Sequence, residues 1–176
     1  AKAEKDAEFD IYVDDAFSTA HRAHASTAGM AAFVPVKAAG RLMQEELDAL
    51  DKALENPEHP VAAIVGGSKI STKLDLLGNL VKKVDYLLIG GAMANTFLAA
   101  KGYKMGDKAM VETGMLDTAK QILANAGKCE IVLPVDLMWV DEFAEGQPAR
   151  YADVDALPEN KIYPDIGPKS TQAFID

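Results

Sequence analysis

Residues 61–100 read VAAIVGGSKISTKLDLLGNLVKKVDYLLIGGAMANTFLAA, and they carry the strongest sign of the fold. Two short apolar runs, VAAIV and YLLI, are each followed at once by a pair of glycines. A fully apolar run of this length is typical of a strand buried on both faces. Behind the first glycine pair, Leu74, Leu77 and Val81 recur at helical spacing. The stretch therefore predicts strand, glycine turn and helix, twice in succession.

The chain after this stretch continues the same alternation. A helix is expected from Thr113 to Asn125, and the run CEIVLPVD predicts a third strand. Repeated strand and helix units indicate an α/β fold, here a Rossmann-like parallel sheet with helices on both faces. Ligands of such sheets bind outside the carboxyl ends of the strands, where both glycine pairs lie. After Asp136 the pattern weakens, and we expect irregular structure or a short strand pair.

The chain before this stretch predicts a separate part. Residues 1–8 are charged and alanine-rich, as at a helix end or a frayed terminus. Alternation in FDIYVDDAF predicts a strand. An apolar stripe predicts a helix from about Lys37 to Glu55, which Asn56–Pro57 would end. At about 1.5 Å per residue, such a helix is long enough to join two domains.

Composition excludes several classes of protein. The chain has 176 residues, a hydrophobic share of 49% and a net charge of −9, so we expect a globular protein that repels nucleic acid and anionic membranes. The single cysteine, Cys129, allows no intrachain disulfide and favours a cytoplasmic setting. No apolar run reaches the roughly 20 residues of a membrane helix, and no signal peptide is visible.

The stretch GGSKISTK favours phosphate binding without matching a common phosphate loop. It has neither the spacing of a P-loop nor that of the dinucleotide fingerprint G-x-G-x-x-G. Gly66 and Gly67 would let backbone N–H groups approach an anion, and the next helix would offer its amino terminus. Lys69 and Lys73 are four residues apart, so in a helix they would share a face. A tight turn with two solvated lysines explains the same residues equally well.

Two further stretches carry candidate chemistry. Gly90 and Gly91 would lie at the same sheet edge and could admit a nucleotide, although plain helix packing also explains them. In STAHRAHAST, Arg22 stands between His21 and His24, and its guanidinium suits a phosphate or carboxylate. The two histidines alone make a weak zinc site, and no serine-nucleophile signature is present. We interpret Trp139 as a core or packing residue and residues 141–145 as a solvated acidic face.

Three stretches together resemble phosphoglycerate kinase. They are YVDDAFSTAHRAHAST, AAIVGGSKISTKLDLLGNLVKKVDYLLIGGAMANTFLAAKG and DIGPKS, in this order, and the resemblance covers nearly the whole chain. The resemblance implies two Rossmann-like domains joined by a helix. It implies that residues 1–36 are the end of the amino-terminal substrate domain, residues 37–57 the interdomain helix and residues 58–176 part of the carboxyl-terminal nucleotide-binding domain. It also implies reversible phosphoryl transfer between 1,3-bisphosphoglycerate and ADP, giving 3-phosphoglycerate and ATP in glycolysis, with Mg²⁺ accompanying the nucleotide.

The resemblance also implies roles for individual residues. Arg22 would bind the phosphoglycerate, and Lys69 would stabilise the transferred phosphoryl group. Lys69 would also bind the nucleotide, together with Lys73 and the glycines Gly66, Gly67, Gly90 and Gly91. The sequence departs from many family members at Thr72, where an aspartate often helps to hold the metal, so no metal ligand is assigned. Ser18 and Ala92 also replace glycines, and the pattern GGSKxSTK is similar to a proteobacterial branch.

The resemblance is to the middle of the enzyme, and both ends of the chain look cut. The segments that complete the substrate and nucleotide pockets are not in the sequence, so we expect a central fragment. The alternative function is an isolated nucleotide-binding module without turnover. A dinucleotide-binding dehydrogenase is disfavoured by the missing G-x-G-x-x-G. The expected partners are small-molecule substrates, without nucleic acid or membrane, and the complete enzyme is expected to be a monomer.

Overall fold

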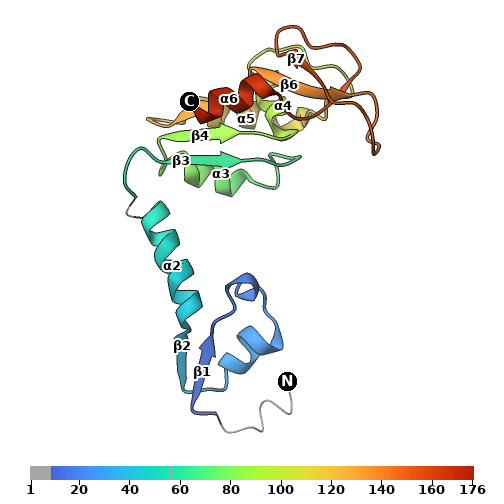
Figure 1. The fold of residues 1–176 in the computed structure, drawn as a ribbon. Coiled ribbons are helices and arrows are strands. Elements are labelled where there is room, and N and C mark those ends of the chain that lie inside the picture. The colour runs from blue at the N-terminus through green and yellow to red at the C-terminus, as the bar shows by residue number, and fades with distance from the viewer. Residues whose placement is uncertain (1–8, 56) are drawn as a thin grey trace. The chain divides into compact units, whose positions relative to one another are not determined.

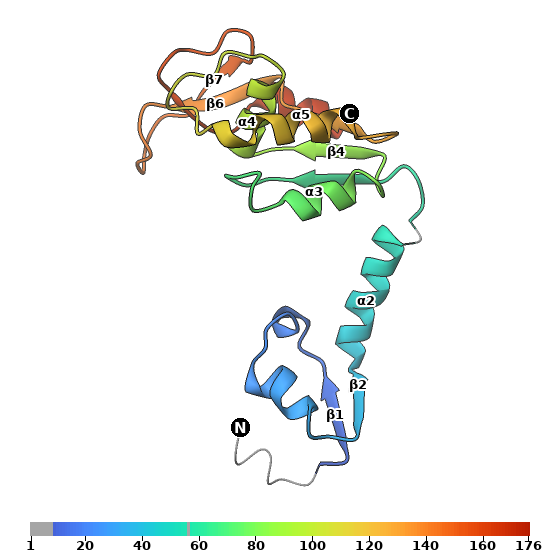
Figure 2. The same cartoon turned by 180° about the vertical axis from the view of Figure 1, so that it is seen from behind.

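The structure is a computed structural model that describes residues 9–55 and 57–176, drawn in Figures 1 and 2. The expectations for residues 1–8 and for Asn56 lie outside the described residues. The chain divides into two compact units, one ending at Glu58 and the other beginning at His59. Within the described ranges, no helix combines the length and the apolar character needed to cross a membrane.

The first unit is built on a two-stranded parallel sheet. Strand β1 (Ile11–Asp14) pairs with β2 (Val36–Ala39), and short helical turns, η1 (Phe17–Thr19) and η2 (Ala25–Gly29), lie between them in the chain. The predicted strand is confirmed. The predicted helix is α2 (Arg41–Leu54), which begins later than expected because Lys37–Ala39 pair with β1 instead.

Helix α2 begins with a cap supplied by another part of the chain. The Met43 N–H donates to Asp15 Oδ1 at 2.9 Å. A Cβ on Gly40, the residue before the helix, would lie 2.2 Å from Asp15 Cγ, so only glycine leaves room for this carboxylate. The apolar stripe of α2 is largely uncovered, since Met43 is buried but Leu47 is 45% exposed.

The second unit contains the predicted parallel sheet. Its strands are β3 (Ala62–Val65), β4 (Tyr86–Ile89) and β5 (Glu130–Val132), in that order across the sheet. The helices that follow the strands are α3 (Leu74–Leu80), α4 (Met93–Ala100) and α5 (Leu116–Ala124), the last preceded by a 3-10 turn, η3 (Thr113–Met115). The mixed α/β fold class is confirmed.

The two faces of this sheet have different neighbours. Val65, Leu87 and Ile89 pack with α3, α4 and α5 in one apolar core. The opposite face turns toward α6 (Pro168–Ile175), where Ile64 shares a cavity with Phe174 and remains 73% exposed. Helices therefore lie on both faces, but the face near α6 is only partly covered (Figures 1 and 2).

The chain after Asp136 is more regular than the sequence indicates. It forms a three-stranded antiparallel sheet with β6 (Asp136–Val140) between β7 (Arg150–Asp153) and β8 (Ile162–Ile166), followed by α6. The expectation of irregular structure or a single strand pair is wrong here. The predicted strand CEIVLPVD is also divided, because Glu130–Val132 joins the parallel sheet and Asp136 begins the antiparallel one.

Helix α4 lies between the two sheets of this unit, which explains its composition. Every residue from Met93 to Leu98 is buried. Phe97 packs in the core under the parallel sheet, and Leu98 packs with Tyr163 of the antiparallel sheet. A helix with apolar residues on all sides is expected to be enclosed in this way. The Asn95 Nδ2 group fastens it by donating to the carbonyls of Ala109 and Tyr163, at 2.6 and 2.8 Å.

The acidic turn after β6 is partly engaged rather than only solvated. Arg150 and Lys161 both pair with the Asp141 carboxylate, and both cations lie over the ring of Trp139, at 4.8 and 5.2 Å from its centroid. These pairs lower the pKa of Asp141, with Lys161 as the main cause. Trp139 therefore packs against the apolar core around Leu137 and Tyr163 and also contacts the two cations at the sheet surface.

Candidate functional site

The two glycine pairs meet at the carboxyl edge of the parallel sheet. Val65 and Ile89 are paired across β3 and β4, so the glycines that follow them emerge side by side. The Gly90 N–H donates to the Val65 carbonyl at 3.0 Å, and the Met93 N–H donates to the Gly67 carbonyl at 2.8 Å. The turn after one strand is thus hydrogen-bonded to the turn after the other.

The approach of the two turns requires glycine. Gly91 has a φ of +65°, and a Cβ there would lie 2.7 Å from the Gly67 carbonyl oxygen and 2.8 Å from the Gly67 nitrogen. No side chain fits at such distances. The Gly91 N–H donates to Asp165 Oδ1 at 3.1 Å, which brings a carboxylate from β8 to the same edge. Sequence patterns do not single out Asp165, although it lies within the DIGPKS stretch.

The two lysines do not share a helical face, so that expectation is wrong. Helix α3 begins at Leu74, and Lys73 is the residue just before it, while Lys69 lies in the preceding turn and is exposed. The Lys73 side chain folds back over the glycines instead, with its Cε 3.1 Å from the place where a Gly67 Cβ would be. The turn closes through the Lys73 N–H, which donates to the Ile70 carbonyl at 2.8 Å.

A glutamate from a distant part of the chain holds this turn. Glu112 accepts hydrogen bonds from the Ile70 N–H at 2.5 Å and from the Ser71 hydroxyl at 2.6 Å. Burial would raise the pKa of Glu112, but the hydrogen bonds from Ser71 and Ile70 and the charge of Lys69 hold that pKa below its usual range. Sequence patterns do not single out Glu112, since it lies 42 residues beyond Ile70.

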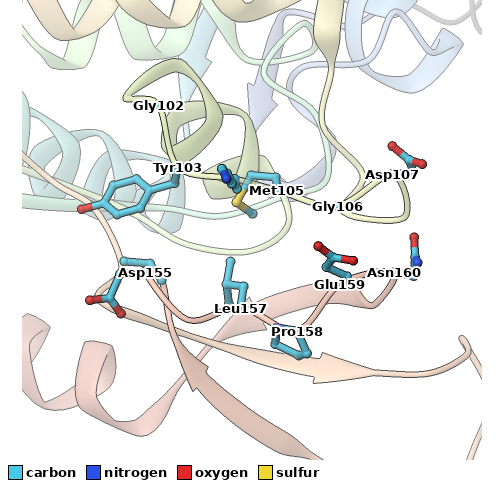
Figure 3. A pocket seen from close by; sticks show the side chains of 12 residues that line it. Gly102, Tyr103, Met105, Gly106, Asp107, Asp155, Leu157, Pro158, Glu159 and Asn160 are labelled. Carbon is cyan, nitrogen blue, oxygen red and sulfur yellow. The ribbon is translucent and has the colours of Figure 1, made fainter.

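A cavity of about 420 Å³ lies beside the glycine pairs. Gly66, Gly67, Gly90 and Gly91 line it together with Asp165 and with apolar side chains of β3, β8 and α6. A larger cavity of about 820 Å³ lies elsewhere, between residues 102–107 and 154–160, where Tyr103 and Met105 face Leu157 and Pro158 (Figure 3). None of the predicted site residues lines the larger cavity.

Arg22 belongs to the first unit. Its side chain is exposed, and its backbone is fixed by the Thr27 hydroxyl, which donates to the Arg22 carbonyl at 2.5 Å. His21 and His24 are also exposed. Across residues 9–55 and 57–176, no group of three or more His, Cys, Asp or Glu side chains is arranged to hold a metal, so the weak zinc hypothesis has no support. The structure thus brings together the two glycine pairs and Lys73 of the second unit, while Lys69 lies exposed in the adjoining turn. Arg22 is described only within the first unit.

A parallel sheet with interlocked glycine turns at its carboxyl edge defines an α/β protein of the Rossmann-like kind. The family model described as phosphoglycerate kinase matches residues 2–176. The chain belongs to the phosphoglycerate kinase family.

Individual relatives agree with this assignment. The phosphoglycerate kinase of Sinorhizobium medicae is 58% identical over 167 residues, which are 94% of this chain and 41% of that protein. The one from Granulibacter bethesdensis is 54% identical over 169 residues, which are 95% of this chain and 42% of that protein. The structure of phosphoglycerate kinase from Coxiella burnetii superposes with a TM-score of 0.82 at 47% identity, covering 94% of this chain and 43% of that one. The chain therefore spans about two fifths of the length of these relatives.

Proposed function

We propose that this chain forms part of the site at which phosphoglycerate kinase transfers a phosphoryl group between 1,3-bisphosphoglycerate and ADP. The observation that carries the proposal is the convergence of both glycine pairs with Lys73 folded over Gly67. A lysine ammonium beside glycine turns, which leave room for a ligand at the sheet edge, suits the phosphates of a nucleotide. Family membership gives the reaction.

The proposed roles follow the chemistry of the transfer. Phosphoryl transfer depends on positioning and on neutralising charge, with little covalent help from the protein. Lys69, exposed in the turn, is assigned to the transferred phosphoryl group. Lys69 is also assigned to the nucleotide, together with Lys73 and the glycines at 66, 67, 90 and 91. Arg22 is assigned to the phosphoglycerate, as a guanidinium that can hold an anionic group with two hydrogen bonds.

Magnesium enters this proposal as part of the nucleotide substrate. The Thr72 hydroxyl, at the position where an aspartate often stands, donates to the Lys69 carbonyl at 3.1 Å and helps to close the turn. No metal-holding cluster exists among the described residues. We therefore assign no magnesium ligand to this chain. We also propose that the protein is cytoplasmic and that the complete enzyme is a monomer.

A second candidate function is a nucleotide-binding module without turnover. It is favoured by the chain spanning only about two fifths of its relatives. Titrating the chain calorimetrically with ADP, with and without Mg²⁺, and running a coupled kinase assay on the same sample separates the two. Binding with turnover supports the kinase, and binding without turnover supports the module. NAD is the specificity control, because binding of NAD in place of ADP would support a dinucleotide binder.

The lysine assignment has its own test. A chimera in which this chain replaces the matched segment of the Sinorhizobium medicae relative provides a complete enzyme. Lys69→Ala in that chimera is expected to lower kcat by at least about 100-fold, the scale lost with one electrostatic group at a transition state. Lys101→Ala, at an exposed lysine following α4, is the control. Near-normal turnover of Lys69→Ala would reject the assignment.

A further inference from the structure

The turn that carries Lys69 is attached to the protein through one carboxylate. Ile70 is fully buried, and its N–H donates to Glu112 Oε2 at 2.5 Å. The Ser71 N–H reaches the same oxygen at 3.3 Å, and the Ser71 hydroxyl donates to Glu112 Oε1 at 2.6 Å. Between them, the two oxygens of the Glu112 carboxylate thus bind Ile70 and Ser71, the two residues directly after Lys69.

Glu112 is itself fixed to the most enclosed element of the unit. Its N–H donates to the Thr96 hydroxyl at 3.0 Å, and Thr96 is fully buried within α4. A continuous path of contacts therefore runs from α4 through Glu112 to the turn. The carboxylate adds rigidity where a glycine pair would otherwise leave the backbone free.

A negative charge at this place opposes the binding of a phosphate. Like charges repel, and the charge of Glu112 also attracts Lys69. The position is therefore best explained by what the carboxylate holds.

We propose that Glu112 is a positioning residue that holds the Ile70–Ser71 turn so that Lys69 faces the phosphate site. This inference rests on the proposed function, which supplies the phosphate ligand. The effect of Glu112 on the turn itself can be tested in the absence of any ligand. A glutamine can reproduce most of the contacts, since its Oε1 can accept from Ile70 and its Nε2 can donate to the Ser71 oxygen. Alanine removes them all.

The first test measures the turn alone. In the full chain, Glu112→Ala is expected to speed hydrogen exchange of the Ile70 and Ser71 amides at least about tenfold, because these N–H groups lose their acceptor. Glu112→Gln is expected to restore protection to within about threefold. The amides of Leu87 and Ile89 report whether the fold is intact. Unchanged exchange at Ile70 and Ser71 in Glu112→Ala would overturn the proposal.

The second test measures the ligand. Glu112→Ala is expected to weaken ADP binding about tenfold, and Glu112→Gln is expected to bind at least as tightly as the original chain because it also removes the repulsion. Glu130→Ala, at an exposed glutamate of β5, is the control. Equal weakening by the Gln and Ala variants would contradict positioning. Failure of the unaltered chain to bind ADP would reject the proposed function, and the exchange result would then decide the role of Glu112 by itself.

Discussion

At the scale of single residues, the two turns at the sheet edge depend on the absence of side chains. Gly91 combines a positive φ with backbone atoms of Gly67 at less than 3 Å from any Cβ. Gly78, inside α3, is different, because a Cβ added there would meet nothing within 4 Å. Substitution by alanine is therefore expected to have opposite effects on stability at Gly91 and at Gly78.

Gly91→Ala is expected to lower the free energy of unfolding by about 2 kcal/mol or more, because the left-handed conformation alone costs about 1–2 kcal/mol. It should also abolish ADP binding by forcing the turns apart. Gly78→Ala is expected to raise stability by about 0.5–1 kcal/mol, since alanine is the better helix former. Urea denaturation measures both variants. A Gly91→Ala chain as stable as the original would show that the turns are not interlocked.

At the scale of elements, α2 and α6 begin in the same way. Each follows a glycine, and each receives its cap from a carboxylate elsewhere in the chain: Asp15 for α2 and Asp136 for α6. Asp136 accepts from the Ser170 N–H at 2.7 Å and from the Lys169 N–H at 3.1 Å. A Cβ on Gly167 would lie 2.2 Å from Asp136 Oδ2, so the glycine leaves the carboxylate its space.

Asp136→Ala is expected to lower the free energy of unfolding by about 2–3 kcal/mol at pH 7, since it removes a cap and leaves buried donors unpaired. Burial would raise the pKa of Asp136, but hydrogen bonds from Ser170 and Lys169 lower it overall. Its stabilisation is therefore present above the unfolded pKa of about 3.9 and is lost as the pH falls through the lower folded value.

The pH dependence gives this prediction a second measurement. The difference in stability between the original chain and Asp136→Ala should be full at pH 7 and should shrink below about pH 4. Asp107→Ala, at an exposed loop residue, is the control and should show little difference at either pH. A difference that stays constant down to about pH 2 would contradict the role given to the carboxylate.

Local sequence patterns predict the elements whose own residues determine their structure, and they miss contacts between distant residues. The sequence predicts strands β3 and β4 and the glycine turns at their ends, because VAAIV and YLLI are apolar runs followed directly by glycine pairs. It does not reveal the antiparallel sheet, because those strands carry charged and apolar residues without clean alternation, and Trp139 is covered by cations from other parts of the chain. No sequence pattern predicts the role of Glu112, because its hydrogen-bond partner Ile70 lies 42 residues away in the chain.

At the scale of the whole molecule, the two units differ in how much apolar surface they bury. The second unit has apolar cores on both sides of α4. In the first unit, Ile11 and Val13 of β1 are 58% and 54% exposed, and Phe33 is 60% exposed. A two-stranded sheet that covers so little of its apolar surface is only marginally stable.

Hydrogen exchange is expected to separate the units. The amides of Ile11–Asp14 should exchange close to the rate of an unfolded chain, while those of Leu87–Ile89 should be protected by a factor that reflects global unfolding. The measurement is residue-resolved exchange at neutral pH. Full protection of β1 would contradict the expectation and would show that the first unit is stable as it stands.

The helix caps supplied by distant residues also determine the order in which elements form during folding. Isolated helices as short as α6 do not persist in water, and α6 takes its cap from Asp136, 34 residues before Ser170. The helix therefore gains its first-turn partners only after β6 has found its place, and closing so long a loop is slow compared with forming a helix turn. We expect α6 to form late, so that Asp136→Ala accelerates unfolding while leaving the folding rate nearly unchanged.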